Sequence, residues 1–259
     1  MSSAELQRQR RVELQGVTNL RNLGGYHTND GTKTTKWGVV YRGDQLSQVP
    51  TDLAQAVLVD KLHIHHTYDL RDGTEVATKS YDIPRIERCA VPIDMSNASH
   101  LLGEGENLKE VSMARRYMQN FYRDLACSYA STVGAIIKGI VDGNASSDNA
   151  SLIHCTAGKD RTGWSCYVLL TLLDVREEEK RADYLLTNRY FGIPANAWDY
   201  DGAEGMSEEA MAALWTVSDT YLDAALEEVN RLGGVHEYAR SHLGLTDADI
   251  QKLRALMLE

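Results

Sequence analysis

The feature that most constrains this chain is the direct passage from a short apolar strand pattern, residues 151–154, to an apolar helical pattern that begins near Arg161. A strand that feeds a helix through so short a turn leaves several backbone N–H groups without carbonyl partners, and the helix dipole adds positive potential there. Such a turn predicts an anion site that fits a tetrahedral phosphate. Cys155 begins the turn, and Arg161 ends it after five intervening residues.

The residue types in this turn indicate phosphoryl chemistry. A cysteine in such a positive environment is favoured as the thiolate, which is the nucleophilic form. Arg161 can hold two phosphate oxygens with its planar guanidinium, and Gly158 lets the backbone approach closely. Thr162 can donate a hydrogen bond to the Cys155 sulfur and help it leave in a second step. We therefore expect a phosphate-binding loop made of Thr156, Ala157, Gly158, Lys159, Asp160 and Arg161.

The rest of the chain alternates between strand and helix patterns. The first forty residues are typical of short strands and turns, with a hairpin at Asp30-Gly31 between Tyr26 and the run 37–41. Further strands are expected at 62–70, 87–93 and 151–154, and helices at 51–61, 107–142 (two helices that break near 127–131), from 161, from 207 and from 246. This order predicts an α/β fold, with a central, mostly parallel sheet flanked by helices and a helical C-terminal part.

One segment interrupts the alternation. Residues 192–206 contain Trp198, Tyr200 and three glycines without a sustained period. We predict an irregular excursion that acts as a lid over the site, with a plain surface loop as the alternative. No linker separates a second domain, so residues 1–259 are expected to form a single domain.

Charge and composition exclude several classes of function. The chain carries 27 basic and 37 acidic residues, a net charge of −10. Such a chain repels polyphosphate backbones and anionic lipids, so no nucleic-acid partner is expected. Residues 1–11 lack the apolar core of a secretory signal, and the longest apolar stretch, 164–175, is too short to span a bilayer. The expectation is a cytoplasmic protein without integral membrane association, with export by a route without a cleaved signal left open and a monomer as the default state.

Cysteine and histidine counts favour neither a disulfide framework nor a metal site. Four cysteines in 259 residues are too few for a disulfide scaffold. His63, His65 and His66 lie close together in sequence, but no carboxylate or cysteine completes a convincing cluster. No metal and no cofactor is therefore expected. Cys89 or Cys166 could trap an oxidised Cys155 as a disulfide, with ordinary burial as the alternative.

The string His154-Cys155-(x5)-Arg161-Thr162 resembles the phosphate-binding loop of the cysteine-dependent protein-tyrosine phosphatase superfamily. Its fuller form, HCxxGKDRT, is similar to that of bacterial tyrosine phosphatases of the mycobacterial PtpB and Listeria LipA type. The resemblance covers most of the chain, since the segments NLRNLGG (19–25), YRGD (41–44), DLR (69–71) with Glu75, and 221–258 also look like that family. The usual family form reads N-x-R-D-x-G-G, and Asn22 replaces its acid here.

The resemblance implies a phosphotyrosine phosphatase-like fold and two-step catalysis without a metal. Cys155 attacks phosphorus to give a phosphocysteine, which water then hydrolyses. Asp160 is the expected proton donor, because myotubularin-like lipid phosphatases also carry an acid just before the arginine. Asp69, at the carboxyl end of a predicted strand, is the second candidate, with an ion pair to Arg71 or Arg42 as its alternative. Asp124 is a weaker candidate that looks like a solvated helix residue.

Two further loop residues have roles implied by the resemblance. Lys159 together with Asp160 resembles loops that accept phosphoinositides as well as phosphotyrosine, and the alternative is an exposed, solvated lysine. His154 is expected to support the loop by orienting it rather than to titrate in turnover.

The resulting hypothesis is a phosphomonoester hydrolase, a protein-tyrosine phosphatase. The nearest alternative is a dual-specificity enzyme that also acts on phosphoserine, phosphothreonine or phosphoinositides. A catalytically silent phosphate-binding module is the alternative from another class. A nucleotide P-loop does not fit, because position 153 is Ile where that motif needs Gly.

Overall fold

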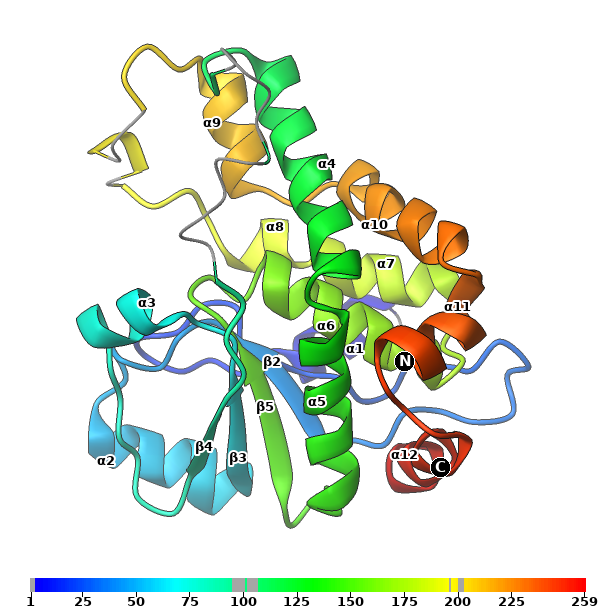
Figure 1. Ribbon diagram of the computed structural model, residues 1–259. Helices are drawn as coiled ribbons and strands as arrows, with labels where there is room; N and C mark the ends of the chain where they lie inside the picture. Colours follow the sequence, from blue (N-terminus) through cyan, green and yellow to red (C-terminus); the bar gives the residue numbers. More distant parts are fainter. Residues whose placement is uncertain (1–2, 95–100, 102–106, 196, 200–202) are drawn as a thin grey trace.

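The computed structural model describes residues 3–94, 101, 107–195, 197–199 and 203–259, and within them five strands form one sheet (Figure 1). Their spatial order is β1 (Arg21–Asn22), β2 (Val40–Gly43), β5 (Ala150–His154), β3 (Ile64–Asp69) and β4 (Glu87–Ala90). β1 runs antiparallel to β2, and every other neighbouring pair is parallel. The predicted α/β class with a mostly parallel sheet is confirmed.

Successive side chains of the central strand β5 point to opposite sides of the sheet, and all of them are buried, so both faces of the strand are covered. Ile153 packs into the larger apolar cluster, and Leu152 packs into the smaller one. The register pairs His154 with Gly43 of β2 and with Asp69 of β3. The carboxyl ends of three strands therefore meet at one edge, and Cys155 follows directly from the middle strand.

Helices cover both faces of the sheet. The larger cluster includes side chains from α4 (Val111–Cys127), α5 (Ala130–Asp142), α6 (Asp160–Leu172) and α10 (Asp219–Arg231). On the other face, α2 (Thr51–Ala54) continues as a π-helix over Gln55–Lys61. The remaining helical elements are α1 (Ser3–Arg10), α3 (Gly73–Thr78), α7 (Glu177–Leu185), α8 (Thr187–Tyr190), a 3-10 turn (Ala197–Asp199), α9 (Glu208–Trp215), α11 (Gly234–Glu237), a π-helix (Tyr238–His242) and α12 (Asp247–Met257).

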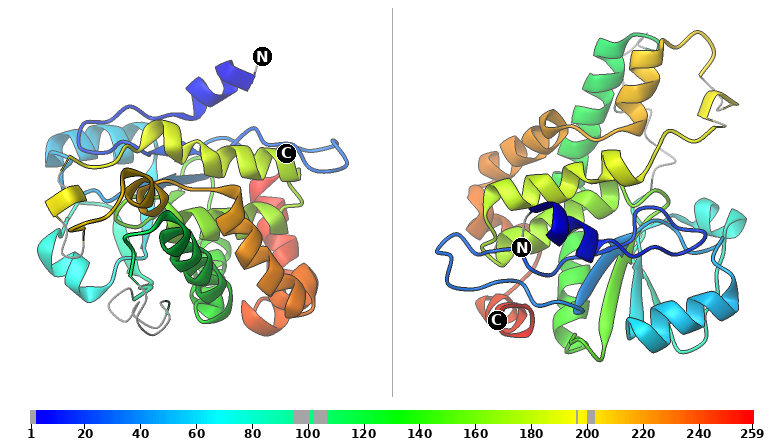
Figure 2. Two further views of the ribbon diagram at one scale, coloured as in Figure 1. Left: turned by 90° about the horizontal axis from the view of Figure 1, so that it is seen from above. Right: turned by 180° about the vertical axis from the view of Figure 1, so that it is seen from behind.

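Two helices rise beyond the carboxyl edge of the sheet. The N-terminal half of α4 and the whole of α9 stand side by side there, as Figures 1 and 2 show. Ala114, Ala210 and Ala213 form their shared contact, and such small side chains let two helices approach closely. The pair makes a wall above the point where β5 ends.

Several predicted boundaries are confirmed. The long helical stretch 107–142 divides into α4 and α5 at residues 128–129. Ser207 accepts a hydrogen bond from the Ala210 N–H at the start of α9, and Thr246 with Asp249 forms a capping box at the start of α12. Among the described helices, none is by itself long and apolar enough to cross a membrane. Only α4 and α5 taken together meet that measure, and they are bent by 57°.

The N-terminal region differs from the prediction in two ways. Residues 3–10 form a helix rather than strands and turns. The Arg10 guanidinium carbon at the end of this helix lies 3.7 Å from the centre of the Tyr26 ring, which anchors the helix. The turn at Asp30-Gly31 connects His27 and Thr34 rather than Tyr26 and the run 37–41. β2 covers only residues 40–43, which pair with β5 on one side and partly with β1 on the other.

Candidate active site

The loop between β5 and α6 makes one very tight approach to a neighbouring strand. Gly158 has a φ of +63°, and a Cβ added there would collide with the carbonyl group of Gly43 at the end of β2. Only glycine combines that left-handed conformation with so little space. The turn that the sequence predicts therefore lies directly against the sheet edge, with Cys155 buried at its start.

The carbonyl groups of the loop point outward. The carbonyl of residue 156 accepts a hydrogen bond from the Gln45 N–H (3.2 Å). Nδ2 of Asn19 donates to the carbonyls of residues 157 (3.2 Å) and 158 (3.0 Å), and Arg42 also donates to the latter (2.9 Å). In a planar trans peptide the N–H points opposite to the C=O. The N–H groups of residues 157–159 consequently face the inside of the loop, where they form a cradle for an anion.

The N-terminal landmarks of the sequence support this loop from outside. Asp183 of α7 binds Nε of Arg21 at 2.9 Å and Nη1 of Arg42 at 2.7 Å, with all three side chains buried. Although burial raises the pKa of Asp183, the two guanidinium groups hold it far below its ordinary value. Asp44 accepts hydrogen bonds from the backbone N–H groups of Asn19 (3.0 Å) and Thr18 (2.9 Å). The segments 19–25 and 41–44 thus act as an outer support for the loop.

Arg161 is held by a bidentate ion pair with Glu75 of α3. Its two terminal nitrogens lie 2.6 and 2.7 Å from the carboxylate oxygens, and Thr156 also donates to that carboxylate. Burial raises the pKa of Glu75, but the Arg161 guanidinium outweighs it and holds the value at about 2. Asp72 caps α3 in a capping box with Glu75, which fixes the start of that helix. Glu75 is one of the landmarks that resemble the family, but its pairing with Arg161 was not predicted from the sequence.

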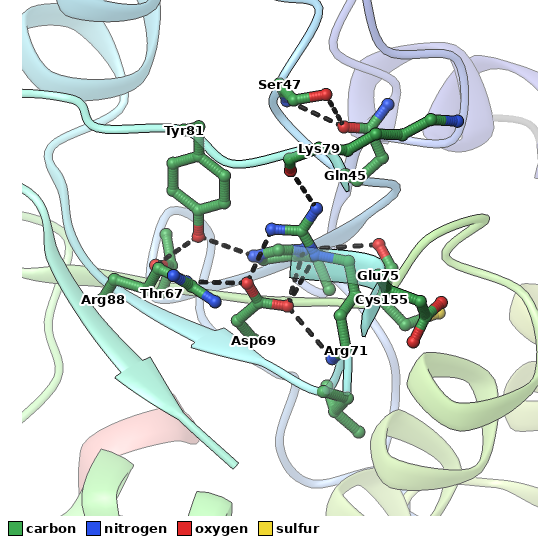
Figure 3. A network of polar contacts seen from close by, with 12 residues as sticks. Gln45, Ser47, Thr67, Asp69, Arg71, Glu75, Lys79, Tyr81, Arg88 and Cys155 are labelled. Atoms are coloured by element: carbon green, nitrogen blue, oxygen red, sulfur yellow. Dashed lines mark hydrogen bonds and ion pairs between the residues drawn. The ribbon is translucent and has the colours of Figure 1, made fainter. Parts of the chain in front are cut away.

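Asp69, the last residue of β3, lies beside His154 and forms ion pairs with two arginines. Its carboxylate accepts from Nε (2.9 Å) and Nη2 (2.8 Å) of Arg71 and from Nε of Arg88 (2.8 Å), as Figure 3 shows. The side chain is 0% exposed, and these contacts hold its pKa at about 2 despite the opposing effect of burial. The ion pair with Arg71, the alternative to a proton-donor role, is present, whereas Arg42 pairs with Asp183 instead.

His154 is fully buried at the end of β5. Burial lowers its pKa to about 4. Nε2 of His154 lies 2.7 Å from the Tyr81 hydroxyl, which is in turn 2.8 Å from the Thr67 hydroxyl. Nδ1 lies 3.3 Å from the Cys155 carbonyl oxygen. These contacts fix the ring beside the cysteine, and the orienting role of His154 stays a prediction.

The side chains of Lys159 and Asp160 are both held by contacts with neighbouring helices. Lys159 is 4% exposed, and Nζ donates to the carbonyl groups of Leu214 and Thr216 at the end of α9. The alternative of an exposed, solvated lysine is therefore wrong, because α9 covers the residue. Asp160 accepts a hydrogen bond from the Tyr122 hydroxyl at 2.9 Å, and its other oxygen lies 3.1 Å from Lys159 Nζ.

A cavity of about 350 Å³ opens above Cys155. Its floor is the loop with Glu75, and its walls are mainly apolar side chains of α4, α9 and their flanks. The wall residues are Leu108, Tyr117, Met118, Phe121, Met206, Met211, Leu214 and Trp215. The expected bond from Thr162 to the Cys155 sulfur is not formed, since Oγ1 of Thr162 is buried without a hydrogen-bond partner among the described residues.

Of the described residues in the segment 192–206, Met206 alone lines this cavity. Trp198 is 48% exposed and lines a separate surface hollow with Pro194 and Glu208. Tyr200 lies outside the described residues. The lid remains a prediction, and the aromatic side chain that lines the cavity from this side is Trp215.

The described residues contain no group of three or more His, Cys, Asp or Glu side chains that could hold a metal ion. His63 is exposed, and His66 lies 3.5 Å from Glu87. The four cysteines are free thiols. Burial raises the pKa of Cys166 to about 12, so that thiol is a poor nucleophile.

The model of one family, described as the tyrosine phosphatase family, matches residues 12–259. The chain belongs to the tyrosine phosphatase family. The phosphatase is also 26% identical over 258 residues to a Cupriavidus necator protein named "Putative tyrosine-protein phosphatase", and the match covers 98% of this chain and 90% of that protein. The phosphatase fold expected from the resemblance agrees with both findings.

Proposed function

We propose that this phosphatase is a cysteine-dependent protein-tyrosine phosphatase of the PtpB and LipA type. The observation that carries the proposal is the position of Cys155, buried at the start of an anion cradle and at the floor of a cavity with aromatic walls. Arg161, oriented by Glu75, supplies the positive charge that the phosphoryl group needs in transfer.

The reaction proceeds in two steps. The Cys155 thiolate attacks phosphorus, the bond from phosphorus to the tyrosine oxygen breaks, and Asp160 gives its proton to the departing oxygen. Water then attacks the phosphocysteine, the phosphorus–sulfur bond breaks, and Asp160 takes a proton from the water. Each group returns to its starting state, and no cofactor is consumed.

The cavity walls support an aromatic substrate. Tyr117, Phe121 and Trp215 line the cavity together with methionine and leucine side chains. Burial of a phenyl ring against such side chains contributes to binding through the hydrophobic effect and through ring contacts. A short phosphoserine side chain would leave these walls largely untouched.

The charge of the cavity argues for a single phosphate. Among the described lining residues, the cations Lys159 and Arg161 are balanced by Asp160 and Glu75. Lys159 is already engaged by two carbonyl groups of the α9 end. A phosphoinositide with several phosphates would have no free cation in these walls, so we place dual specificity behind phosphotyrosine.

The nucleophile is tested by Cys155→Ser. We expect loss of turnover on a phosphotyrosine peptide, with binding of inorganic phosphate or vanadate retained because backbone N–H groups make the cradle. Turnover is measured with EDTA present, and anion binding by calorimetry. A serine variant with activity near that of the native enzyme would contradict the mechanism. A native enzyme that binds phosphate but hydrolyses no phosphomonoester would be a binding module.

The proton donor is tested by Asp160→Asn, which keeps the volume and removes the ionisable proton. Tyrosine, with a pKa of about 10, needs a proton to leave, whereas nitrophenolate departs largely without one. We expect phosphotyrosine hydrolysis to fall by about 10²–10⁴, a smaller loss on p-nitrophenyl phosphate, and disappearance of the alkaline limb of the pH–rate profile. Equal losses on both substrates would make Asp160 a structural residue. Leaving-group dependence in Asp69→Asn instead would move the acid role to Asp69.

A further inference from the structure

Three tyrosines from three helices meet beside Asp160. Tyr122 comes from α4, Tyr184 from α7 and Tyr221 from α10, and none is more than 2% exposed. The Tyr122 ring stands edge-on to Tyr184, with centroids 6.1 Å apart, and its centroid lies 5.8 Å from that of Tyr221. Since buried phenol groups need hydrogen-bond partners, the direction in which each hydroxyl donates carries information.

Two of these hydroxyls form a chain that ends on Asp160. The Tyr184 hydroxyl donates to the Tyr122 oxygen at 2.7 Å, and Tyr122 donates to Oδ1 of Asp160 at 2.9 Å. Because the Tyr122 oxygen already accepts from Tyr184, its own hydrogen is directed to the carboxylate. The Tyr221 hydroxyl donates elsewhere, to the Ala213 carbonyl at 2.9 Å.

Two cations of the loop itself also lie near Asp160. Lys159 Nζ lies 3.1 Å from Oδ2, and the Arg161 guanidinium is close enough that Asp160 contributes to raising the pKa of Arg161. Asp160 and Lys159 line the cavity, whereas Tyr122 is fully buried. The carboxylate is thus held from its buried side by Tyr122 and from its other oxygen by Lys159, which fixes its orientation toward the cavity.

We infer that Tyr122, supported by Tyr184, is the positioning residue for the Asp160 carboxyl group in proton transfer. The inference rests on the proposed function, in which Asp160 exchanges protons with the leaving oxygen and with water. A hydrogen bond to a carboxylate both favours the ionised form and fixes its direction. Removing the Tyr122 hydroxyl should therefore slow proton transfer and move the alkaline limb of the rate profile upward in pH.

The test is Tyr122→Phe, which removes one oxygen and keeps the ring, with Tyr221→Phe as the matched control. For each variant, kcat/KM is measured against pH on a phosphotyrosine peptide and on p-nitrophenyl phosphate. For Tyr122→Phe we expect a loss of roughly tenfold on the peptide, as for a hydrogen bond to a charged group, and a smaller loss on nitrophenyl phosphate. The limb that Asp160→Asn abolishes should move upward by about 0.5–1 pH unit. Tyr221→Phe should leave that limb in place.

Tyr184→Phe provides a second variant, because it removes the hydrogen bond that the Tyr122 oxygen accepts and leaves the one from Tyr122 to Asp160 in place. We expect the same upward movement of the limb, of smaller size. If Tyr122→Phe and Tyr221→Phe move the limb equally, or if neither moves it, the inference is overturned while the proposed function stands. A native enzyme without activity on either substrate would contradict the proposed function instead.

Discussion

The loop of residues 155–161 and the wall of α4 and α9 above it are each held in place by different forces. Residues 155–161 are fixed by charged and polar contacts from elements far apart in the chain, such as Asn19 on the loop carbonyls and Glu75 on Arg161. The contact between α4 and α9 rests on alanines such as Ala114 and Ala210. Directional contacts specify one geometry, whereas apolar contacts tolerate adjustment. We infer that the loop determines the chemistry and the wall determines which substrates reach it.

The largest expected effect comes from breaking the loop at Arg161. Arg161→Lys keeps the charge but cannot reproduce the two parallel bonds to Glu75 or hold two phosphate oxygens. We expect kcat/KM on phosphotyrosine to fall by about 10²–10³, as for loss of a group that stabilises transition-state charge. Steady-state kinetics measures it. A loss below about tenfold, roughly 1.4 kcal/mol, would mean that Arg161 does not stabilise the transition state.

A second effect concerns the stability that the buried His154 gives to the same region. The pKa of His154 is about 4 in the folded state and about 6.5 when unfolded, so the unfolded chain binds the extra proton between those values. The stability linked to His154 is therefore complete above pH 6.5 and is lost as the pH falls toward 4. The difference in unfolding free energy between the native chain and His154→Gln should shrink by up to about 3 kcal/mol over that window.

Denaturant unfolding at several pH values measures this difference. The exposed histidine His236 serves as the control, because His236→Gln removes a ring that lies on the surface. A difference between the native chain and His154→Gln that stays constant from pH 7 to pH 4 would show that His154 binds its proton equally well in the folded and the unfolded chain.

The smallest expected effect tests the wall. Trp215→Ala removes an aromatic side chain that lines the cavity, whereas Trp198→Ala removes one that lines a different hollow. We expect Trp215→Ala to raise KM for a phosphotyrosine peptide by about tenfold, with inhibition by inorganic phosphate changed much less. Trp198→Ala should change neither value. A KM increase confined to Trp198→Ala would favour the lid interpretation of residues 192–206.

The comparison also explains how far the sequence could predict the site. Cys155 and Arg161 are separated by one short turn, so local spacing is enough to predict their cradle. Glu75 and Tyr122 act through contacts across 86 and 38 residues, and no local pattern encodes such a partner. For Lys159 the sequence leaves a solvated side chain open as an alternative, because nothing near it in the chain shows that the end of α9 will cover it. The α/β class could be predicted because hydrophobic periodicity is a local signal. The pairing partners of β2 could not, because they depend on contacts between distant parts of the chain.

The loop support has a consequence for how the chain folds. Arg21 and Arg42 meet Asp183 across 162 and 141 residues, and Asn19 meets Gly158 across 139. Contacts of such long sequence separation close late, because the entropy of large loops must be overcome first. During synthesis, Cys155 and Arg161 would emerge before Asp183 is available to neutralise the two buried arginines. Nascent chains that end before α7 would therefore carry Cys155 and Arg161 without the support that shapes their loop, and that support is complete only after Asp183 has been made.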